Sequence, residues 1–243
     1  MELKPGLRRV GNEIVACYLL IDDRGVTVVD AGLAGQYSEL RDELAAAGRT
    51  LDDVRAVILT HGDTDHIGFA ERLRREHGVP VYVHAADAAR ARGESKPSAS
   101  FGRGIRPWPI VRFFAYALSR GGGRTEYLTE VRTVADGDRL GDLPGAPVIV
   151  GMPGHSPGSV AVHSPELDAV CVGDALTTRH VLTGRRGPAP APFTDDPGVA
   201  LDSLDRLAAL DATWVLPGHG TPWNRGTREA VRLVREAAEA PVR

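Results

Sequence analysis

The chain has 243 residues, of which 42% are hydrophobic and 25% charged, and 29 basic against 32 acidic residues give a formal net charge of −3 at pH 7. This near-neutral balance argues against a nucleic-acid-binding protein, because such proteins usually carry a strongly basic face. A chain of this length buries enough apolar surface to fold without disulfide bonds. No apolar run approaches the roughly 18 residues of a membrane-spanning helix.

The N-terminal sequence and the cysteines bear on the cellular compartment. The first six residues, MELKPG, lack a basic segment followed by an apolar stretch, so no secretory signal peptide is expected. Cys17 and Cys171 each lie within an apolar, strand-like run, and neither has the spacing of a metal ligand. We expect two buried, reduced thiols in a cytoplasmic protein.

In the first half of the chain, short β-rich runs alternate with helical periodicity. In chain order, the predicted elements are strands at 13–21 and 25–30, a helix at 37–47, a strand at 54–59, a helix at 66–77 and a strand at 81–84. Residues 93–106 are rich in Gly, Ser, Pro and Arg, which is typical of a connector. The apolar stripe that follows predicts a helix from Pro107 to about Arg120, closed by three glycines.

Strands dominate again in the second half, and two helices cover them. The predicted elements are strands at 131–134, 147–152, 159–163 and 169–173, a Pro-rich loop at 187–192, a helix through 201–210, a strand at 213–216 and a helix through 231–238. Two similar halves, each with a sheet and covering helices, predict a four-layer sandwich with two internal sheets.

The densest cluster of reactive side chains is HGDTDH at residues 61–66, directly after the predicted strand 54–59. It offers four imidazole and carboxylate groups, and Gly62 frees the backbone to turn them toward one centre. Such ligands suit zinc, iron or manganese. A solvated loop in which Asp65 caps the helix over 66–77 would explain the same residues, so this cluster alone leaves both interpretations open.

Three further loops place a histidine or an aspartate directly after a predicted strand. They hold, in chain order, His155, Asp174 and His219. Any one of them is explained as a turn residue, but four such clusters in one chain favour a metal centre, since a rigid scaffold presents a site on its strand ends.

Together the four clusters resemble the metallo-β-lactamase superfamily, whose motif H-x-H-x-D-H is followed by a distant His, an Asp and a last His. The resemblance runs from the first hairpin to the final His loop. It implies an α/β fold in which two mixed β-sheets flanked by helices form a four-layer αββα sandwich. It also implies a single domain over residues 1–243, with an apolar helical insertion at about 105–121.

By position, the resemblance implies a binuclear metal site. The implied ligands are His61, Asp63 and His155 for metal one, Asp65, His66 and His219 for metal two, and Asp174 as a bridge between them. We expect two divalent ions, zinc first, with iron or manganese as alternatives. Asp63 departs from the motif, because a histidine is usual there. A carboxylate would make site one harder and more negative, unless Asp63 only hydrogen-bonds its neighbours.

The resemblance also implies the chemistry. A metal-bound hydroxide would attack a carbonyl, and Asp65, the expected catalytic residue, would orient the hydroxide and help to move a proton to the leaving group. The expected function is a metal-dependent hydrolase of an ester, thioester, lactone or lactam. We expect a small-molecule substrate, no nucleic-acid or membrane partner, and a homodimer as an open alternative to a monomer.

Other functions stay open at this point. Superfamily members of the flavodiiron type carry a carboxylate at the position of Asp63, so a di-iron oxidoreductase lacking its own flavin domain is one alternative. A non-catalytic metal-binding sensor is another. Within the hydrolases, Thr177 stands where quorum-quenching lactonases carry a tyrosine. Glyoxalase II-type thioesterases hold substrate carboxylates with basic residues, for which Arg179, Arg185 and Arg186 are candidates.

The apolar helix at 107–118 also has two interpretations. It would act as a lid over the metal site, since its glycine-rich flanks let it move, and would then favour a hydrophobic acyl group or ring. Alternatively it packs against the rest of the domain or lies at a dimer contact.

Overall fold

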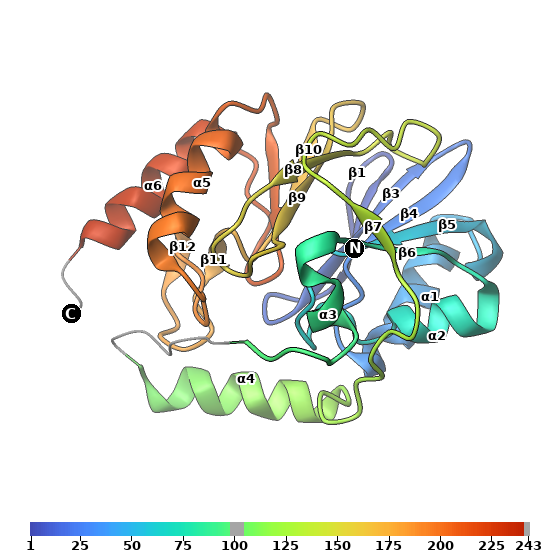
Figure 1. Ribbon diagram of the computed structural model, residues 1–243, viewed down its shortest axis with the longest axis horizontal. Coiled ribbons are helices and arrows are strands. Elements are labelled where there is room, and N and C mark those ends of the chain that lie inside the picture. The colour runs from blue at the N-terminus through green and yellow to red at the C-terminus, as the bar shows by residue number, and fades with distance from the viewer. Residues whose placement is uncertain (98–104, 241–243) are drawn as a thin grey trace.

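The computed structural model describes residues 1–97 and 105–240. Two β-sheets lie face to face, with helices on both outer sides (Figure 1). Residues 98–104, in the predicted connector 93–106, lie outside the described part of the chain.

The larger sheet has seven strands arranged in chain order. The first four pair antiparallel, whereas the last four run parallel, because long connections that include helices link them. The strands are β1 (Glu2–Lys4), β2 (Leu7–Gly11), β3 (Ala16–Asp22), β4 (Gly25–Val29), β5 (Val54–Ile58), β6 (Val81–His84) and β7 (Arg132–Val134).

The smaller sheet has four strands in the order β13-β10-β9-β8, in which only β10 and β13 are parallel. Its strands are β8 (Val148–Gly151), β9 (Val160–Ser164), β10 (Ala169–Gly173) and β13 (Trp214–Pro217). A separate two-stranded ribbon consists of β11 (Thr177–Arg179) and β12 (Arg186–Ala189).

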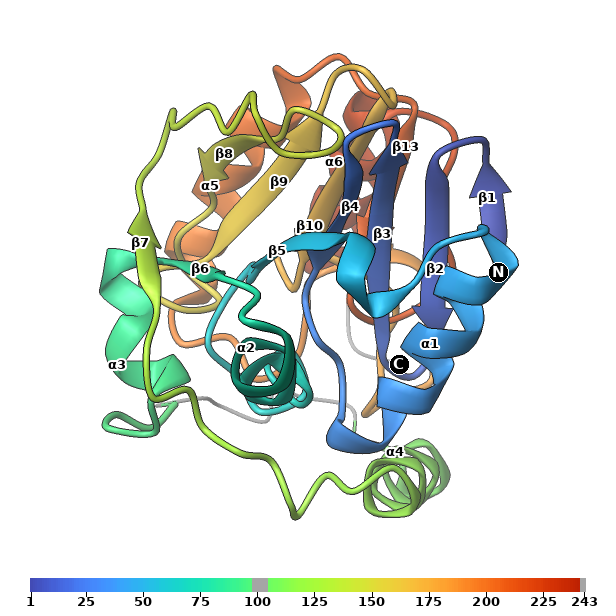
Figure 2. The same cartoon turned by 90° about the vertical axis from the view of Figure 1, so that its right-hand side faces the viewer.

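Six α-helices and three short 3₁₀ helices complete the described fold. The α-helices are α1 (Tyr37–Ala46), α2 (Ala70–His77), α3 (Ala88–Ala91), α4 (Pro107–Ser119), α5 (Pro197–Ala208) and α6 (Thr227–Glu239). The 3₁₀ helices are η1 (Ala34–Gln36), η2 (Leu51–Asp53) and η3 (Ala85–Asp87). Figure 2 shows α1 and α2 in front of the larger sheet, with α5 and α6 behind the smaller one.

Three apolar clusters hold the four layers together. The first lies between α1, α2 and the larger sheet, the second between the two sheets, and the third between the smaller sheet and α5 and α6. In β3, Cys17 and Leu19 face the first cluster while Tyr18 and Leu20 face the second, because successive side chains of a strand point to opposite faces. This strand therefore has no charged residue before its last one, Asp22, and the predicted αββα sandwich is confirmed.

Helix α4 lies apart from these layers (Figures 1 and 2). Its inner face packs Phe113, Tyr116 and Ala117 against a small cluster of Ile14, Val15 and Leu33. Its outer face is also apolar and exposed, with Trp108, Val111, Phe114 and Leu118. The helix predicted at 107–120 is thus present, and its use in a dimer stays a prediction.

Two predictions of local structure are wrong, and one N-terminal segment was missed. The helix predicted at 66–77 begins only at Ala70, so Asp65 does not cap it; the residues before Ala70 form turns that direct His66 inward. The Pro-rich loop at 187–192 begins inside β12. The segment from β1 to β2 was not predicted as β-structure.

Both cysteines are buried and free, as predicted. Within the described residues, no helix has the length and apolar character needed to cross a membrane.

Candidate metal centre

Four loops that follow β5, β8, β10 and β13 converge and bring together all seven residues singled out in the sequence. Residues 61–66 follow β5, His155 follows β8, Asp174 directly follows β10, and His219 lies just beyond β13. The four histidines and Asp174 are buried, whereas Asp63 and Asp65 are half-buried. A strand end is a stiff support, so these side chains have little freedom to separate.

The four imidazoles point their Nε2 atoms at one another and at three carboxylates. Asp63 Oδ2 lies 3.5 Å from Nε2 of His61 and 3.4 Å from Nε2 of His155. Asp65 Oδ2 lies 3.4 Å from Nε2 of His219. Asp63 therefore faces the predicted site one and Asp65 the predicted site two.

Asp174 stands between these two groups. Its Oδ2 lies 3.3 Å from Nε2 of His219 and 3.7 Å from Nε2 of His155, and its Oδ1 lies 3.6 Å from Nε2 of His66. Three sets of candidate ligand atoms lie within 4.8 Å of one another: His61, Asp63 and His155; His61, His66 and Asp174; and Asp65, His66 and His219. Asp63 and Asp65 belong to different sets and Asp174 to the third, and the division into two metal sites stays a prediction.

Each histidine has its other ring nitrogen, Nδ1, beside a fixed protein group. His66 Nδ1 lies 2.9 Å from Asp30 Oδ2, and His219 Nδ1 lies 2.5 Å from the carbonyl oxygen of Ile14. Two hydroxyls serve the remaining rings, Thr60 Oγ1 at 3.0 Å from His61 and Thr194 Oγ1 at 3.3 Å from His155. Metal-binding histidines are usually oriented in this way.

The carboxylates favour positive charge among the imidazoles. Burial alone would lower the pKa of His66, but Asp30, Asp174 and Asp65 outweigh it and raise that pKa to about 10. At His219, burial also lowers the pKa, but the carboxylates of Asp174 and Asp65 outweigh it and raise that pKa to about 9. Such a potential stabilises a bound cation.

Three buried polar atoms at the centre fit metal ligands. Among the described residues, Nε2 of His61, Nε2 of His66 and Oδ1 of Asp174 are buried without a hydrogen-bond partner. An unsatisfied buried polar atom is costly, and a divalent ion held by imidazole nitrogens and carboxylate oxygens would satisfy all three. The residues present therefore fit the metal that the sequence predicted.

Sequence reasoning missed three residues that support these ligands. Asp30, which follows β4, accepts hydrogen bonds from the backbone N–H of Thr60 at 2.8 Å and contacts His66. Asp87 accepts from Gly62 N–H at 2.8 Å and Gly158 N–H at 2.7 Å, tying two ligand loops together. Arg90 binds Asp63. One feature of the sequence could have indicated Asp30, namely its place directly after a strand. Asp87 and Arg90 lie in a segment without any motif.

Other polar residues near the centre have structural partners. Arg179 and Arg186, two of the candidates for binding a substrate carboxylate, contact the carboxylate of Glu13 at 2.6 and 3.3 Å, and Arg112 of α4 contacts it at 2.8 Å. Glu13 precedes the residue whose carbonyl oxygen contacts His219. Three guanidinium groups around one carboxylate leave an excess of positive charge beside the centre.

Helix α4 borders the same side of the centre. The ring centroid of Phe113 lies 6.1 Å from that of His219, in an edge-on arrangement. Arg112 joins the helix to Glu13, and Gly35 N–H donates to Arg120 carbonyl oxygen at 2.7 Å. The helix thus places one aromatic ring, that of Phe113, beside a candidate ligand.

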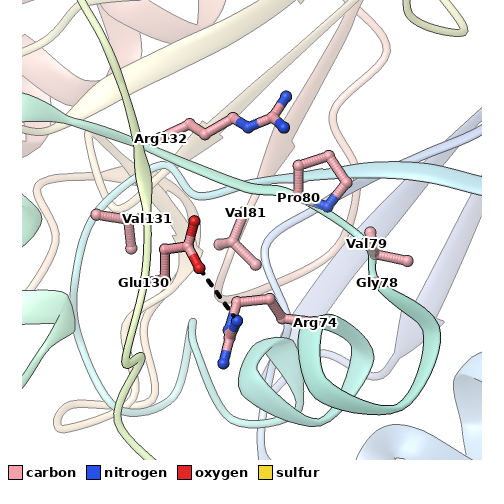
Figure 3. A pocket seen from close by; sticks show the side chains of 8 residues that line it. All are labelled: Arg74, Gly78, Val79, Pro80, Val81, Glu130, Val131 and Arg132. Carbon is pink, nitrogen blue, oxygen red and sulfur yellow. Dashed lines mark hydrogen bonds and ion pairs between the residues drawn. The ribbon is translucent and has the colours of Figure 1, made fainter.

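A surface pocket lies near the opposite ends of the parallel strands (Figure 3). Its lining runs from the C-terminal end of α2 to the first residues of β6 and β7, and Arg74 contacts Glu130 there at 3.4 Å. None of its lining residues is one of the seven candidate ligands, so it does not belong to the metal centre.

Comparison with known protein families agrees with this geometry. The model of the metallo-beta-lactamase superfamily matches residues 10–219, which include all seven candidate ligands. The chain belongs to the metallo-β-lactamase superfamily. Membership supports a metal-dependent hydrolase in general, and the superfamily binds divalent metals, often two.

Individual relatives support the same assignment. The chain is 27% identical over 209 residues to "Probable metallo-hydrolase YflN" of Bacillus subtilis, covering 80% of this chain and 75% of that one. It is similar to the metallo-beta-lactamase family protein TTHA1429 of Thermus thermophilus, with 25% identity, a TM-score of 0.70, and coverage of 96% of this chain and 79% of that one. It is also similar to TTHA1623, solved in a di-iron-bound form, with 27% identity, a TM-score of 0.62, and coverage of 91% and 96%.

Proposed function

We propose that this protein is a binuclear metallo-hydrolase that cleaves an ester, thioester, lactone or lactam bond in a small molecule. The observation that carries the proposal is the arrangement of four imidazoles whose Nε2 atoms face three carboxylates while every Nδ1 contacts a fixed protein group. Such an array presents several imidazole nitrogen and carboxylate oxygen ligands at once, which suits divalent cations.

The ligands are assigned by their grouping. His61, Asp63 and His155 would hold metal one, Asp65, His66 and His219 would hold metal two, and Asp174 would bridge them. We propose zinc as the native metal, since imidazole nitrogen supplies four of the seven ligands. Iron is the alternative, because the related TTHA1623 was solved in a di-iron-bound form.

The bound metals would supply Lewis acidity and a water of lowered pKa. The protein would contribute position and proton transfer. Asp65 is half-buried, and its Oδ2 lies beside His219, so its carboxylate is placed to accept a proton from the attacking water and return it to the leaving group. Asp174 and the histidines would keep the reacting groups in place.

Two groups of side chains beside the centre would select the substrate. The ring of Phe113 would contact an apolar acyl group or ring, since it lies next to His219. The guanidinium groups around Glu13 carry a net positive charge, so a substrate with a carboxylate would be attracted to that side.

The test is to purify the protein without added metal, measure its metal content, and assay the zinc- and iron-loaded forms on a panel of esters, thioesters, lactones and lactams. We expect two ions per chain and hydrolysis of at least one class. Iron together with oxygen consumption, and no hydrolysis, would instead identify a di-iron oxidoreductase. Bound metal without any turnover would refute an enzyme and indicate a sensor.

A further inference from the structure

Arg90 occupies an unusual place for a buried cation, directly beside a predicted metal site. It lies in α3, and only 5% of it is exposed. Its Nε and Nη2 bind the two carboxylate oxygens of Asp63, the latter at 2.9 Å from Oδ2. Its Nη1 donates to Asp195 Oδ2 at 2.8 Å. The guanidinium group is therefore held between two carboxylates on different loops.

The contacts divide the two oxygens of Asp63 between different tasks. Arg90 binds both oxygens, but only Oδ2, which accepts from Arg90 Nη2, also faces Nε2 of His61 and of His155, at 3.5 and 3.4 Å. A paired guanidinium and carboxylate keep a fixed, planar geometry. Asp63 is thus presented to site one through a single oxygen in one orientation.

The charges also combine. The usual motif has a neutral histidine at position 63. Here Asp63 contributes one negative charge, and the positive charge of Arg90, which also binds Asp195, partly offsets it. Asp195 contacts the far corner of the guanidinium, away from the edge that binds Asp63.

Two further contacts show that this placement is built into the fold. A Cβ atom at Gly62 would lie 2.7 Å from the backbone nitrogen of Ala91 and 3.0 Å from Cβ of Arg90, so the glycine between His61 and Asp63 allows the ligand loop to reach α3. Asp195 N–H donates to the carbonyl oxygen of His155 at 3.1 Å. Arg90 therefore connects Asp63 to the loop that holds the other ligand, His155.

We propose that Arg90 is a positioning residue of metal site one, which fixes the orientation of Asp63 and offsets part of its charge, so that the two act together in place of the usual histidine. This inference rests on the proposed function only in taking Asp63 as a metal ligand. Substitution of Arg90 would leave Asp63 negatively charged and free to rotate, and loss of a residue that orients a ligand typically weakens metal binding about 10- to 100-fold.

The test measures binding of Zn²⁺ alone, with no substrate, by competition with a chelator and by metal analysis of the dialysed protein. We expect two ions per chain in the wild type and, in Arg90→Gln, an about 10- to 100-fold loss of affinity for one of them. Arg90→Lys keeps the positive charge but not the planar guanidinium group that binds both oxygens of Asp63, so it should recover only part of the lost zinc affinity. Arg74→Gln is the matched control, because Arg74 binds buried Glu71 through the same Nε and Nη2 edge, at 2.9 and 2.8 Å, near the opposite ends of the strands.

A double substitution separates positioning from mere structural support. Asp63→His alone leaves the cationic Arg90 beside a neutral ring and a bound cation, whereas Asp63→His with Arg90→Gln restores the usual motif without the extra charge. We expect the double variant to bind the site-one ion more tightly than either single variant. If Arg90→Gln alone fails to fold, the comparison of the double variant with Asp63→His still tests the role of Arg90.

The outcomes distinguish this inference from the proposed function. Two ions bound equally well by wild type and Arg90→Gln, a single ion in the wild type, or a double variant no better than the single ones would overturn it. A zinc-loaded wild type with the expected binding pattern but no hydrolysis would refute the proposed function and leave the role of Arg90 standing.

Discussion

Replacing Asp87 should show how strongly the support of the ligand loops contributes to stability. Its carboxylate is fully buried and accepts hydrogen bonds from Gly62 N–H at 2.8 Å, Gly158 N–H at 2.7 Å and the Ser156 hydroxyl at 2.7 Å. Gly62 belongs to the loop of His61 and Asp63, and the other two donors flank the loop of His155. Asp87 therefore connects the two halves of site one.

The expected cost of Asp87→Ala follows from these three donors. A buried donor left without an acceptor costs about 1–3 kcal/mol. The Ser156 hydroxyl keeps an alternative partner, Ser159 Oγ at 2.8 Å, so the loss falls on the two backbone N–H groups. We expect the free energy of unfolding to fall by about 3 kcal/mol, and by only about 1 kcal/mol in Ser156→Ala, which leaves both N–H groups paired.

Urea unfolding of the metal-free proteins would measure these changes, and Zn²⁺ binding to the same samples would report the state of the centre. Asp22→Ala is the control, because Asp22 also accepts a backbone N–H, that of Gly145 at 2.8 Å, but lies beside the first residue of β4, at the strand ends away from the ligand loops. The control should lose stability and keep its zinc affinity, whereas Asp87→Ala should lose both. An unfolding free energy of Asp87→Ala within about 1 kcal/mol of the wild type would refute this account of the loops.

Three further predictions address the centre, the substrate and the pH dependence of stability. The variants His155→Ala, Asp174→Ala and His219→Ala each remove one candidate ligand. Each should lower the metal content and reduce kcat/KM more than about 100-fold, while the far-UV circular dichroism spectrum stays unchanged. Phe113→Ala should raise KM for bulky acyl substrates about 10-fold relative to acetyl substrates, with the metal content unaltered. An equal change in KM for bulky and acetyl substrates would contradict contact between the Phe113 ring and the acyl group. Hydrogen bonds from Arg74 and Thr129 lower the pKa of Glu71 below its ordinary 4.5, against the effect of burial. That stabilisation is complete above pH 4.5 and is lost as the pH falls through the lower pKa of the folded state, so Glu71→Gln should destabilise by about 1–2 kcal/mol at pH 7 and less at pH 3.

The strands and helices that sequence predicted best are those whose burial is uniform. Most residues of β3, β4 and β5 are apolar because these strands are covered on both faces, and the exposed Arg55 of β5 is an exception. The strand β2 was missed because it contains Arg8 and Arg9, both buried. Arg8 is held by Glu43 of α1 at 2.9 Å, a partner that only the folded chain brings near.

The prediction that a helix begins at residue 66 was wrong for a reason specific to the site. The apolar periodicity of Ile67, Ala70 and Leu73 is real, since all three are buried. However, His66 must direct its ring toward Asp174 and Asp30, and the carbonyl oxygen of His66 accepts a hydrogen bond from Ala31 N–H at 2.6 Å. These contacts hold the backbone in a turn and delay the helix to Ala70.

The candidate ligands were predictable because each lies in a short local pattern, whereas the residues that support them were not. Asp87 and Arg90 stand in an alanine-rich segment, AADAARA at residues 85–91, which alone predicts only a short surface helix. Their roles depend on contacts with loops that are between 25 and 105 residues away in the chain. No local pattern records such contacts.

Asp63 shows what this difference means for chemistry. Taken by itself in the sequence, a carboxylate in place of histidine makes site one more negative and favours harder ions than zinc. In the structure the same carboxylate is bound through both oxygens by a buried guanidinium, which also binds Asp195, so part of the added charge is offset where it arises. On the proposal made above, the metal preference of site one depends on the pair rather than on Asp63 alone. Because zinc already suits the two histidines of that site, an intact pair should keep zinc competitive with iron and manganese, and the harder character expected from the motif should emerge only when Arg90 is removed.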